Sequence, residues 1–337
     1  MATIPNSQNF PQFSQADIIS EMKKVSNIDI SDFRFYPAIQ NRPNEIIKIE
    51  SEENGIVLTF GTVARKALLS YTHETSLHLY KPADATVDTL YLHINIWTDD
   101  IFRVVFSKEK KISNPFSGLP ENARMLIAKP EKVEFTLDET ENKITLTTSK
   151  TEITVDKKTT RISAKFIDGK EFYSQKKQDF RTGDIHDLAL ADSDNDYACF
   201  EALELESDEI IYGLGERFDS LTRNGRTVDF HNKDAVGTTS RRAYINIPFY
   251  LSTKGYGLFL NSGAKTDWQI ATTDLSALQF AVLDSQLDYF VIGGKTPKDI
   301  IKGYCSLTGL SKLPPLWSFG LWMSRKSYVS WDVVDAI

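Results

Sequence analysis

The glycines and charged side chains best suited to chemistry are concentrated between residues 211 and 234. The motif Gly213-Leu-Gly215 has two glycines of a phosphate-binding loop, but position 218 is Phe where the third is needed, and no βαβ pattern surrounds it. A tight bend or bulge is the better interpretation. The adjacent charges Glu216 and Arg217 either anchor this loop through an ion pair or hydrogen bonds, which we favour, or contact a ligand directly.

Metal and redox chemistry have little support in the sequence. The histidines at positions 73, 78, 93, 186 and 231 show no ligand spacing on a common element. Cys199 and Cys305 match no metal or redox spacing, so we predict two reduced thiols. We therefore predict neither a metal nor a cofactor.

The net charge and the hydropathy of the chain limit the classes of partner that it can bind. The net charge is −7 and no basic stripe is present, which argues against nucleic acid. No stretch approaches the ~18 apolar residues of a membrane span, and the first ten residues lack the features of a signal peptide. These observations predict a cytoplasmic protein without a membrane partner.

The elements that must position these residues are mainly strands. Leu90, Leu92, Ile94 and Ile96 alternate with more polar residues up to a turn at 98–100, and a second strand follows over 101–106. This pattern predicts a hairpin. Further short strands, with closely spaced turns, predict an antiparallel β-sandwich or barrel. A strand is also expected over 133–137.

Helical spacing appears near both ends of the chain. Residues 11–28 have apolar residues at helical spacing behind a capping serine. Thr296-Pro-Lys-Asp299 begins a second helix, which Gly309 ends. After a Pro-Pro linker, residues 317–323 are expected to form a buried strand and residues 330–337 to start another helix.

These patterns give four expected segments. An N-terminal extension with a short helix covers 1–43, the β-sandwich covers 44–296, and a helix with its linker covers 297–316. One strand and part of one helix cover 317–337.

Three segments resemble glycoside hydrolase family 31, most closely its α-xylosidase branch. They lie at 211–234 (beginning IYGLGERF), at 244–261 (YINIPFYL, then GYGLFLN) and at 287–322 (LDYFVI, then LPPLWSFGLW). No single motif is decisive, but their order and spacing match the family.

The resemblance implies a mutarotase-like β-sandwich followed by a (β/α)8 barrel, of which 317–337 would be the truncated start. The two catalytic aspartates of the family, a nucleophile and an acid/base, would lie beyond residue 337, so no catalytic residue is expected in this chain. The implied reaction removes α-linked sugar units with retention.

Two residues are candidate sugar contacts by resemblance. Asp234 closes a segment that begins at His231, where many relatives have Trp, and its carboxylate could accept hydrogen bonds from vicinal sugar hydroxyls. It could equally be a turn aspartate that bonds its own backbone. Trp322 would either shape the floor of the sugar site or pack under the barrel.

The resemblance therefore predicts the N-terminal portion of an α-glycosidase of the α-xylosidase type, which acts on terminal α-linked xylosyl or glucosyl units of oligosaccharides and is inactive on its own. The alternative is a non-catalytic carbohydrate-binding β-sandwich. The sequence leaves homo-oligomerisation open.

Overall fold

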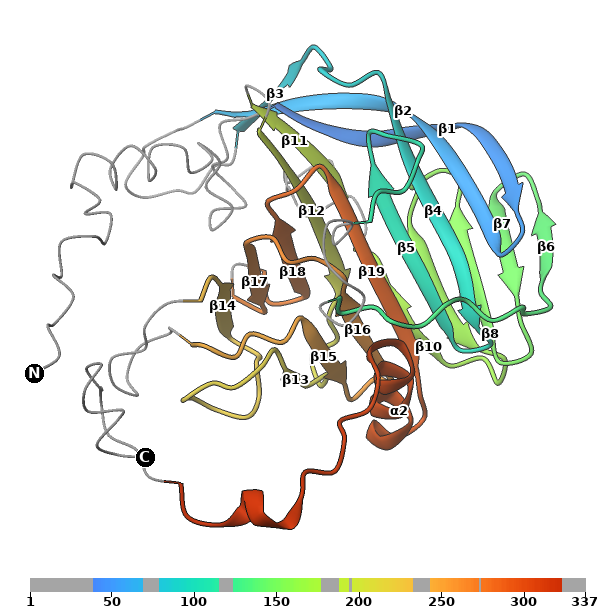
Figure 1. Ribbon diagram of the computed structural model, residues 1–337. Helices are drawn as coiled ribbons and strands as arrows, with labels where there is room; N and C mark the ends of the chain where they lie inside the picture. Colours follow the sequence, from blue (N-terminus) through green and yellow to red (C-terminus); the bar gives the residue numbers. More distant parts are fainter. Residues whose placement is uncertain are drawn as a thin grey trace, which may run out of the picture.

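The computed structural model describes residues 39–68, 79–114, 124–176, 188–193, 196–232, 243–272 and 274–322. Within these residues the protein is mainly β, and every strand pairing is antiparallel (Figure 1). The strands form a large curved sheet and a small sheet, which share one hydrophobic core. This architecture confirms the expected antiparallel β-sandwich.

The large sheet contains fourteen of the described strands, in the order β13-β15-β16-β19-β5-β4-β2-β1-β11-β12-β18-β17-β14, with β3 paired to β2. Their bounds are β1 (Ile39–Glu52), β2 (Gly55–Leu68), β3 (Leu79–Ala83), β4 (Thr89–Thr98), β5 (Ile101–Ser107), β11 (Ala189–Ser193), β12 (Asp196–Glu204), β13 (Ile211–Gly213), β14 (Arg226–Phe230), β15 (Phe249–Ser252), β16 (Tyr256–Leu260), β17 (Thr266–Ile270), β18 (Ala277–Val282) and β19 (Gln286–Gly293).

The small sheet has the order β10-β9-β8-β7-β6. Its strands are β6 (Thr136–Glu139), β7 (Lys143–Thr147), β8 (Thr151–Asp156), β9 (Ile162–Phe166) and β10 (Glu171–Ser174). Alternate residues along β7, β8 and β9 are buried, as expected for strands with one face on a core. The first strand starts at Thr136 rather than at the predicted residue 133.

The β4–β5 hairpin forms where the alternation predicted it. The four alternating apolar residues of β4 are fully or almost fully buried. A register shift between Ile96 and Thr98 precedes the turn, and the Thr98 hydroxyl donates to the Asp100 carboxylate at 2.9 Å. Local alternation and turn chemistry were sufficient to place this element.

The two terminal strands of the large sheet, β13 and β14, lie on the same side of the molecule (Figure 1). The chain between them joins both edges: Thr222 forms a bridge with Tyr212 of β13, and the Gly225 N–H donates to the Ile270 carbonyl of β17 at 2.8 Å. The loops that connect these edges carry the residues singled out from the sequence.

Helix α2 (Pro297–Thr308) confirms the helix that the capping residues predicted. Thr296 and Asp299 form a reciprocal capping box, and Gly309 follows the helix with φ of 90°. Ile300 and Leu307 are buried against the sheet. The ring of Tyr304 stacks on Phe249 of β15 with a centroid distance of 4.1 Å.

Three boundaries differ from expectation or fall outside the described residues. The first strand begins at Ile39, inside the expected extension, and the helix expected over 11–28 lies outside the described residues.

The prediction of a buried strand over 317–323 was wrong. A short 3₁₀ helix, η3 (Leu316–Phe319), forms instead, and none of its side chains is buried. A buried parallel strand needs hydrogen-bonded neighbours, and no described strand pairs with this segment. Residues 323–337 are outside the described part of the chain.

Candidate functional site

The turn after β13 is left-handed over three successive residues. Gly213, Leu214 and Gly215 have φ values of 114°, 61° and 83°. A Cβ on Gly213 would lie 2.7 Å from the Phe249 carbonyl oxygen, and one on Gly215 would lie 2.1 Å from that of Ile245. The glycines therefore allow two backbone segments to approach closely, which confirms the bend and not a phosphate loop.

Arg217 anchors this turn to the neighbouring loop. Its Nε donates to the Leu214 carbonyl at 3.2 Å, its Nη2 donates to the Asn246 Oδ1, and its guanidinium lies 5.5 Å from the ring centre of Phe230. The Asn246 amide in turn donates to the Asn232 Oδ1. These bonds confirm a hydrogen-bond anchor at Arg217, although its partner is a neighbouring loop of the sandwich.

The contact between Asn246 and Asn232 links two segments that lie apart in the sequence. Asn232 follows β14 and Asn246 precedes β15, so this bond joins the described chain after one strand to the described chain before the other. Glu216 takes a different part: its side chain is exposed, and its backbone N–H donates to the Ile245 carbonyl at 3.0 Å.

Arg223 holds the other side of the turn. Its Nε donates to the Gly213 carbonyl at 2.7 Å, and its Nη1 donates to the Asp219 carboxylate at 2.6 Å and to the Ser220 carbonyl at 2.8 Å. Sequence reasoning assigned no role to Arg223 or Asn246, although both lie in the segments that resemble the family. Their partners are carbonyls and amides positioned by the left-handed turn, so residue type alone carried no signal for them.

Burial lowers the pKa of Arg217, and the nearby Arg223 guanidinium lowers it further, whereas the carboxylates of Asp219 and Asp229 oppose both effects. An arginine remains protonated near neutral pH despite such a shift. We call Arg217, Asp219, Arg223 and Asp229 the loop cluster. It combines two guanidinium groups with two carboxylates, and it therefore suits polar neutral ligands better than strongly charged ones.

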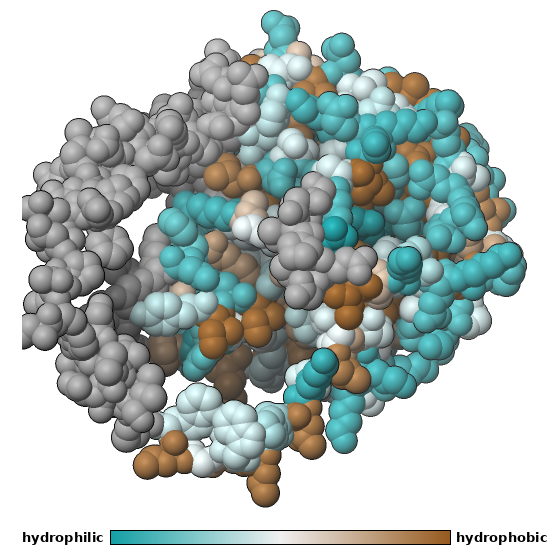
Figure 2. All heavy atoms as spheres, viewed as in Figure 1, coloured by the Kyte–Doolittle hydropathy of each residue, from teal (hydrophilic) through white to brown (hydrophobic). Residues whose placement is uncertain are grey.

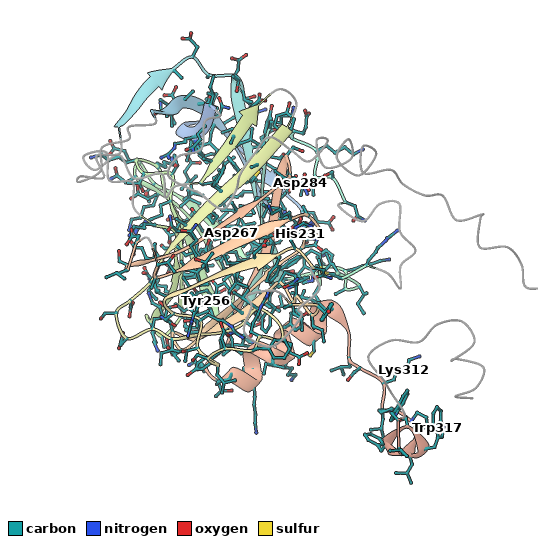
Figure 3. All side chains as sticks on the ribbon, turned by 90° about the vertical axis from the view of Figure 1, so that its left-hand side faces the viewer. His231, Tyr256, Asp267, Asp284, Lys312 and Trp317 are labelled. Atoms are coloured by element: carbon teal, nitrogen blue, oxygen red, sulfur yellow. The ribbon has the colours of Figure 1, made fainter. Side chains whose placement is uncertain are left out.

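Of the two predicted sugar contacts, only Trp322 lies within the described residues. Asp234 lies outside the described residues, although His231 and Asn232, just before it, are exposed at the end of β14. Trp322 is 72% exposed, and its indole Nε1 donates to the Ser318 carbonyl at 2.6 Å within its own segment. Figure 3 shows Trp317 on an extension that stands away from the strand carrying Asp267 and from His231. The sugar-binding roles of Asp234 and Trp322 remain predictions.

Large apolar side chains are exposed on the loops that carry the loop cluster, at positions Phe218, Leu221, Tyr244, Ile245 and Ile247. We call these five residues the apolar rim. Apolar side chains gathered on a surface are typical of a contact with another domain or protein.

Among the residues that the structure describes, no group of three or more His, Cys, Asp or Glu side chains is placed to hold a metal ion. In the same part of the chain, no helix is long and apolar enough to cross a membrane.

Residues 91–268 match the family described as the glycosyl hydrolase 31 N-terminal galactose mutarotase-like domain. The chain is 47% identical over 124 residues to alpha-xylosidase XylQ of Lactiplantibacillus pentosus and 44% identical over 122 residues to an alpha-xylosidase of Emericella nidulans. These matches cover 37% and 36% of this chain, but 16% of each relative. It is also 29% identical over 250 residues, or 72% of this chain and 29% of the relative, to alpha-glucosidase 2 of Bacillus thermoamyloliquefaciens.

Solved structures show the same fold. A cycloalternan-forming enzyme from Listeria monocytogenes has a TM-score of 0.65 at 23% identity, over 85% of this chain and 24% of that one. A family 31 alpha-xylosidase from a soil metagenome has a TM-score of 0.57 at 17% identity, over 80% of this chain and 35% of that one. The chain belongs to glycoside hydrolase family 31, and its sandwich is the N-terminal galactose mutarotase-like domain of that family.

Proposed function

We propose that this chain is the N-terminal part of an α-glycosidase of the α-xylosidase type. The complete enzyme releases terminal α-linked xylosyl or glucosyl units from oligosaccharides with retention, in the cytoplasm. The observation that carries the proposal is the identity to two proteins named alpha-xylosidase, 47% and 44%, against 29% to a protein named alpha-glucosidase 2.

The chain alone is inactive under this proposal. Retaining hydrolysis uses two carboxyl groups about 5–5.5 Å apart on opposite sides of the glycosidic bond. The family places both on a (β/α)8 barrel, and the segments matched here cover only 16% of the xylosidase relatives. The apolar rim supports this division of labour, because it offers a surface for a second domain to cover.

Asp234 and Trp322 are the residues of this chain that we assign to the sugar. The bonds from Arg217 to Asn246 and from Asn246 to Asn232 fix the chain just before Asp234. A carboxylate at the mouth of a barrel can accept hydrogen bonds from sugar hydroxyls without forming a covalent bond. A carbohydrate-binding module without catalysis is the alternative, but the likeness to xylosidases favours the enzyme.

The test is a chimera in which this chain replaces the matching N-terminal region of the L. pentosus xylosidase. We expect the chimera to retain hydrolysis of an aryl α-xyloside, because this chain would replace the corresponding N-terminal domain of a xylosidase. Asp234→Ala should lower kcat/KM about tenfold to a hundredfold, because charge-assisted hydrogen bonds contribute about 1.5–3 kcal/mol each. Asp208→Ala, which changes an exposed turn aspartate, is the matched control.

The isolated chain, assayed beside a mock preparation, should give no turnover. Turnover above the mock that is lost on mutating an Asp or Glu of this chain would contradict the proposal. Unchanged kinetics in the Asp234→Ala chimera would show that Asp234 is only a turn residue.

A further inference from the structure

A cleft of about 540 Å³ lies beside β5 and the end of β16 and shares no residue with the loop cluster. Two backbone segments form its walls. The segment 112–114 is held by Ser113, whose N–H and hydroxyl donate to the Gln286 Oε1 at 2.8 and 3.1 Å. The segment 124–129 is held to α2, since the N–H groups of Ile127 and Ala128 donate to the Leu307 carbonyl at 3.0 and 3.1 Å. Both walls are fixed, so the cleft is preformed.

Arg103 and Asn261, which also line the cleft, share one buried anchor. The Asp288 carboxylate is 2% exposed and accepts two hydrogen bonds from Arg103, from Nε and Nη2, each at 2.7 Å. It also accepts one from the Asn261 Nδ2 at 2.7 Å. A bidentate arginine–carboxylate pair has a fixed geometry, so the two lining side chains are held rigidly relative to each other.

Each of these two side chains keeps one polar group unused. Asn261 is 2% exposed, and its Oδ1 has no hydrogen-bond partner within the described residues. The Arg103 Nη1 makes no hydrogen bond in that part of the chain either, because both bonds of the guanidinium come from Nε and Nη2. Turning the Asn261 amide over would place its oxygen against the Asp288 carboxylate, so the orientation is fixed. A buried polar atom without a partner indicates that something else satisfies it.

The pair of groups defines the ligand chemistry. An amide oxygen repels the oxygens of a phosphate or carboxylate, and the charge of Arg103 is already neutralised by Asp288. Between Asn261 and Arg103, a neutral group that donates to the amide oxygen and accepts from the guanidinium therefore fits best, and a hydroxyl does both. Arg124 and Lys129 also line the cleft and add cationic donors, so the neutral character belongs to this pair and not to the whole lining. The volume lies within the range of small-molecule sites, about 300–1,000 Å³.

We infer that this cleft is a second, non-catalytic saccharide site, in which a sugar hydroxyl donates to the Asn261 Oδ1 and accepts from the Arg103 Nη1. It shares no residue with the loop cluster and does not depend on the proposed reaction. Neighbouring hydroxyls of the same sugar would reach the polar side chains of the walls, such as Lys129.

The test is titration of the ¹⁵N-labelled chain with methyl α-D-xylopyranoside and methyl α-D-glucopyranoside, followed by amide chemical shifts. We expect saturable shifts at Asn261 and along both walls. Asn261→Leu should weaken binding about threefold to tenfold through the lost hydrogen bond. Ser113→Trp should abolish binding, because Ser113 is exposed in the wall and a large ring there blocks the cleft without entering the core. Glu141→Trp, in the exposed turn between β6 and β7, is its matched control.

The outcomes separate this site from the proposed function. Loss of binding in Asp234→Ala, with shifts confined to residues near 231–246, would place the sugar at the rim and overturn the inference. Displacement by inorganic phosphate would show an anion site instead. Absence of saturable shifts would also overturn it, while leaving the activity of the chimera untouched. If Asn261→Leu does not fold, Ser113→Trp against Glu141→Trp decides alone.

Discussion

Helix α2 and the segment after it are both rich in apolar side chains, yet only the helix has apolar side chains that are fully buried. Ile300 and Leu307 are at most 1% exposed against the sheet. In the segment 313–322, all six large apolar side chains are at least 68% exposed. Figure 2, viewed as Figure 1, shows this segment at the lower edge of the molecule. Apolar sequence alone therefore does not predict burial; a matching surface must also be present.

The largest effect is expected on self-association. Exposed apolar segments promote contacts between molecules, so deleting residues 313–337 should reduce aggregation of the chain, measured by light scattering and size-exclusion chromatography. A milder variant that replaces Leu316, Trp317 and Leu321 by serine should act in the same direction. More aggregation after the deletion would show that the segment packs on the sandwich in solution.

A smaller effect is expected on folding stability. Leu307→Ala should lower the free energy of unfolding by about 2–5 kcal/mol, because it removes buried methyl groups and leaves a cavity. Leu316→Ala should change it by no more than about 0.5 kcal/mol, since an exposed side chain has little packing to lose. Urea unfolding of both variants measures the difference. An equal loss of unfolding free energy in the two variants would show that the two regions do not differ in packing.

The smallest effect concerns two ion pairs, one partly buried and one exposed, which differ in burial as helix α2 and the segment 313–322 do. Burial raises the pKa of Asp274, but hydrogen bonds from the Lys176 ammonium and from Ser276 outweigh it and lower the pKa to about 2. A carboxyl with a lowered pKa stabilises the fold above its unfolded value of 3.8, and this stability is lost as pH falls toward 2. After allowance for solvent screening the contribution is about 1 kcal/mol.

Asp274→Asn should therefore flatten the acid dependence of stability between pH 4 and pH 2, as measured by urea unfolding at several pH values. Asp168→Asn is the control. Asp168 pairs with Lys295 at 2.7 Å, but both side chains are more than half exposed. The comparison fails if both variants flatten the curve equally.

The sequence predicted correctly those elements that depend on patterns of neighbouring residues. The β4–β5 hairpin and the capped helix α2 follow from alternation, turn residues and the Thr296–Asp299 box. The anchoring role of Arg217 was also foreseeable, because a charge inside an apolar motif needs a partner. Its actual partner Asn246, 29 residues away, was not foreseeable.

The strand expected over 317–323 shows the limit of such local reasoning. Its apolar residues are compatible with a buried strand, but strand formation depends on hydrogen bonds to neighbours that the sequence of the segment does not contain. Within the described residues no neighbour is present, and the backbone forms η3 instead.

The sequence by itself determined the antiparallel β class, the family, the bend at Gly213 and Gly215, and the helix after the sandwich, because each depends on nearby residues or on an ordered set of motifs. Only the tertiary structure decided which strands are neighbours and which polar groups meet. The pair Arg103–Asp288 joins residues 185 positions apart. Such a meeting is set by the register between β5 and β19, where a slip of one residue would turn every side chain to the opposite face.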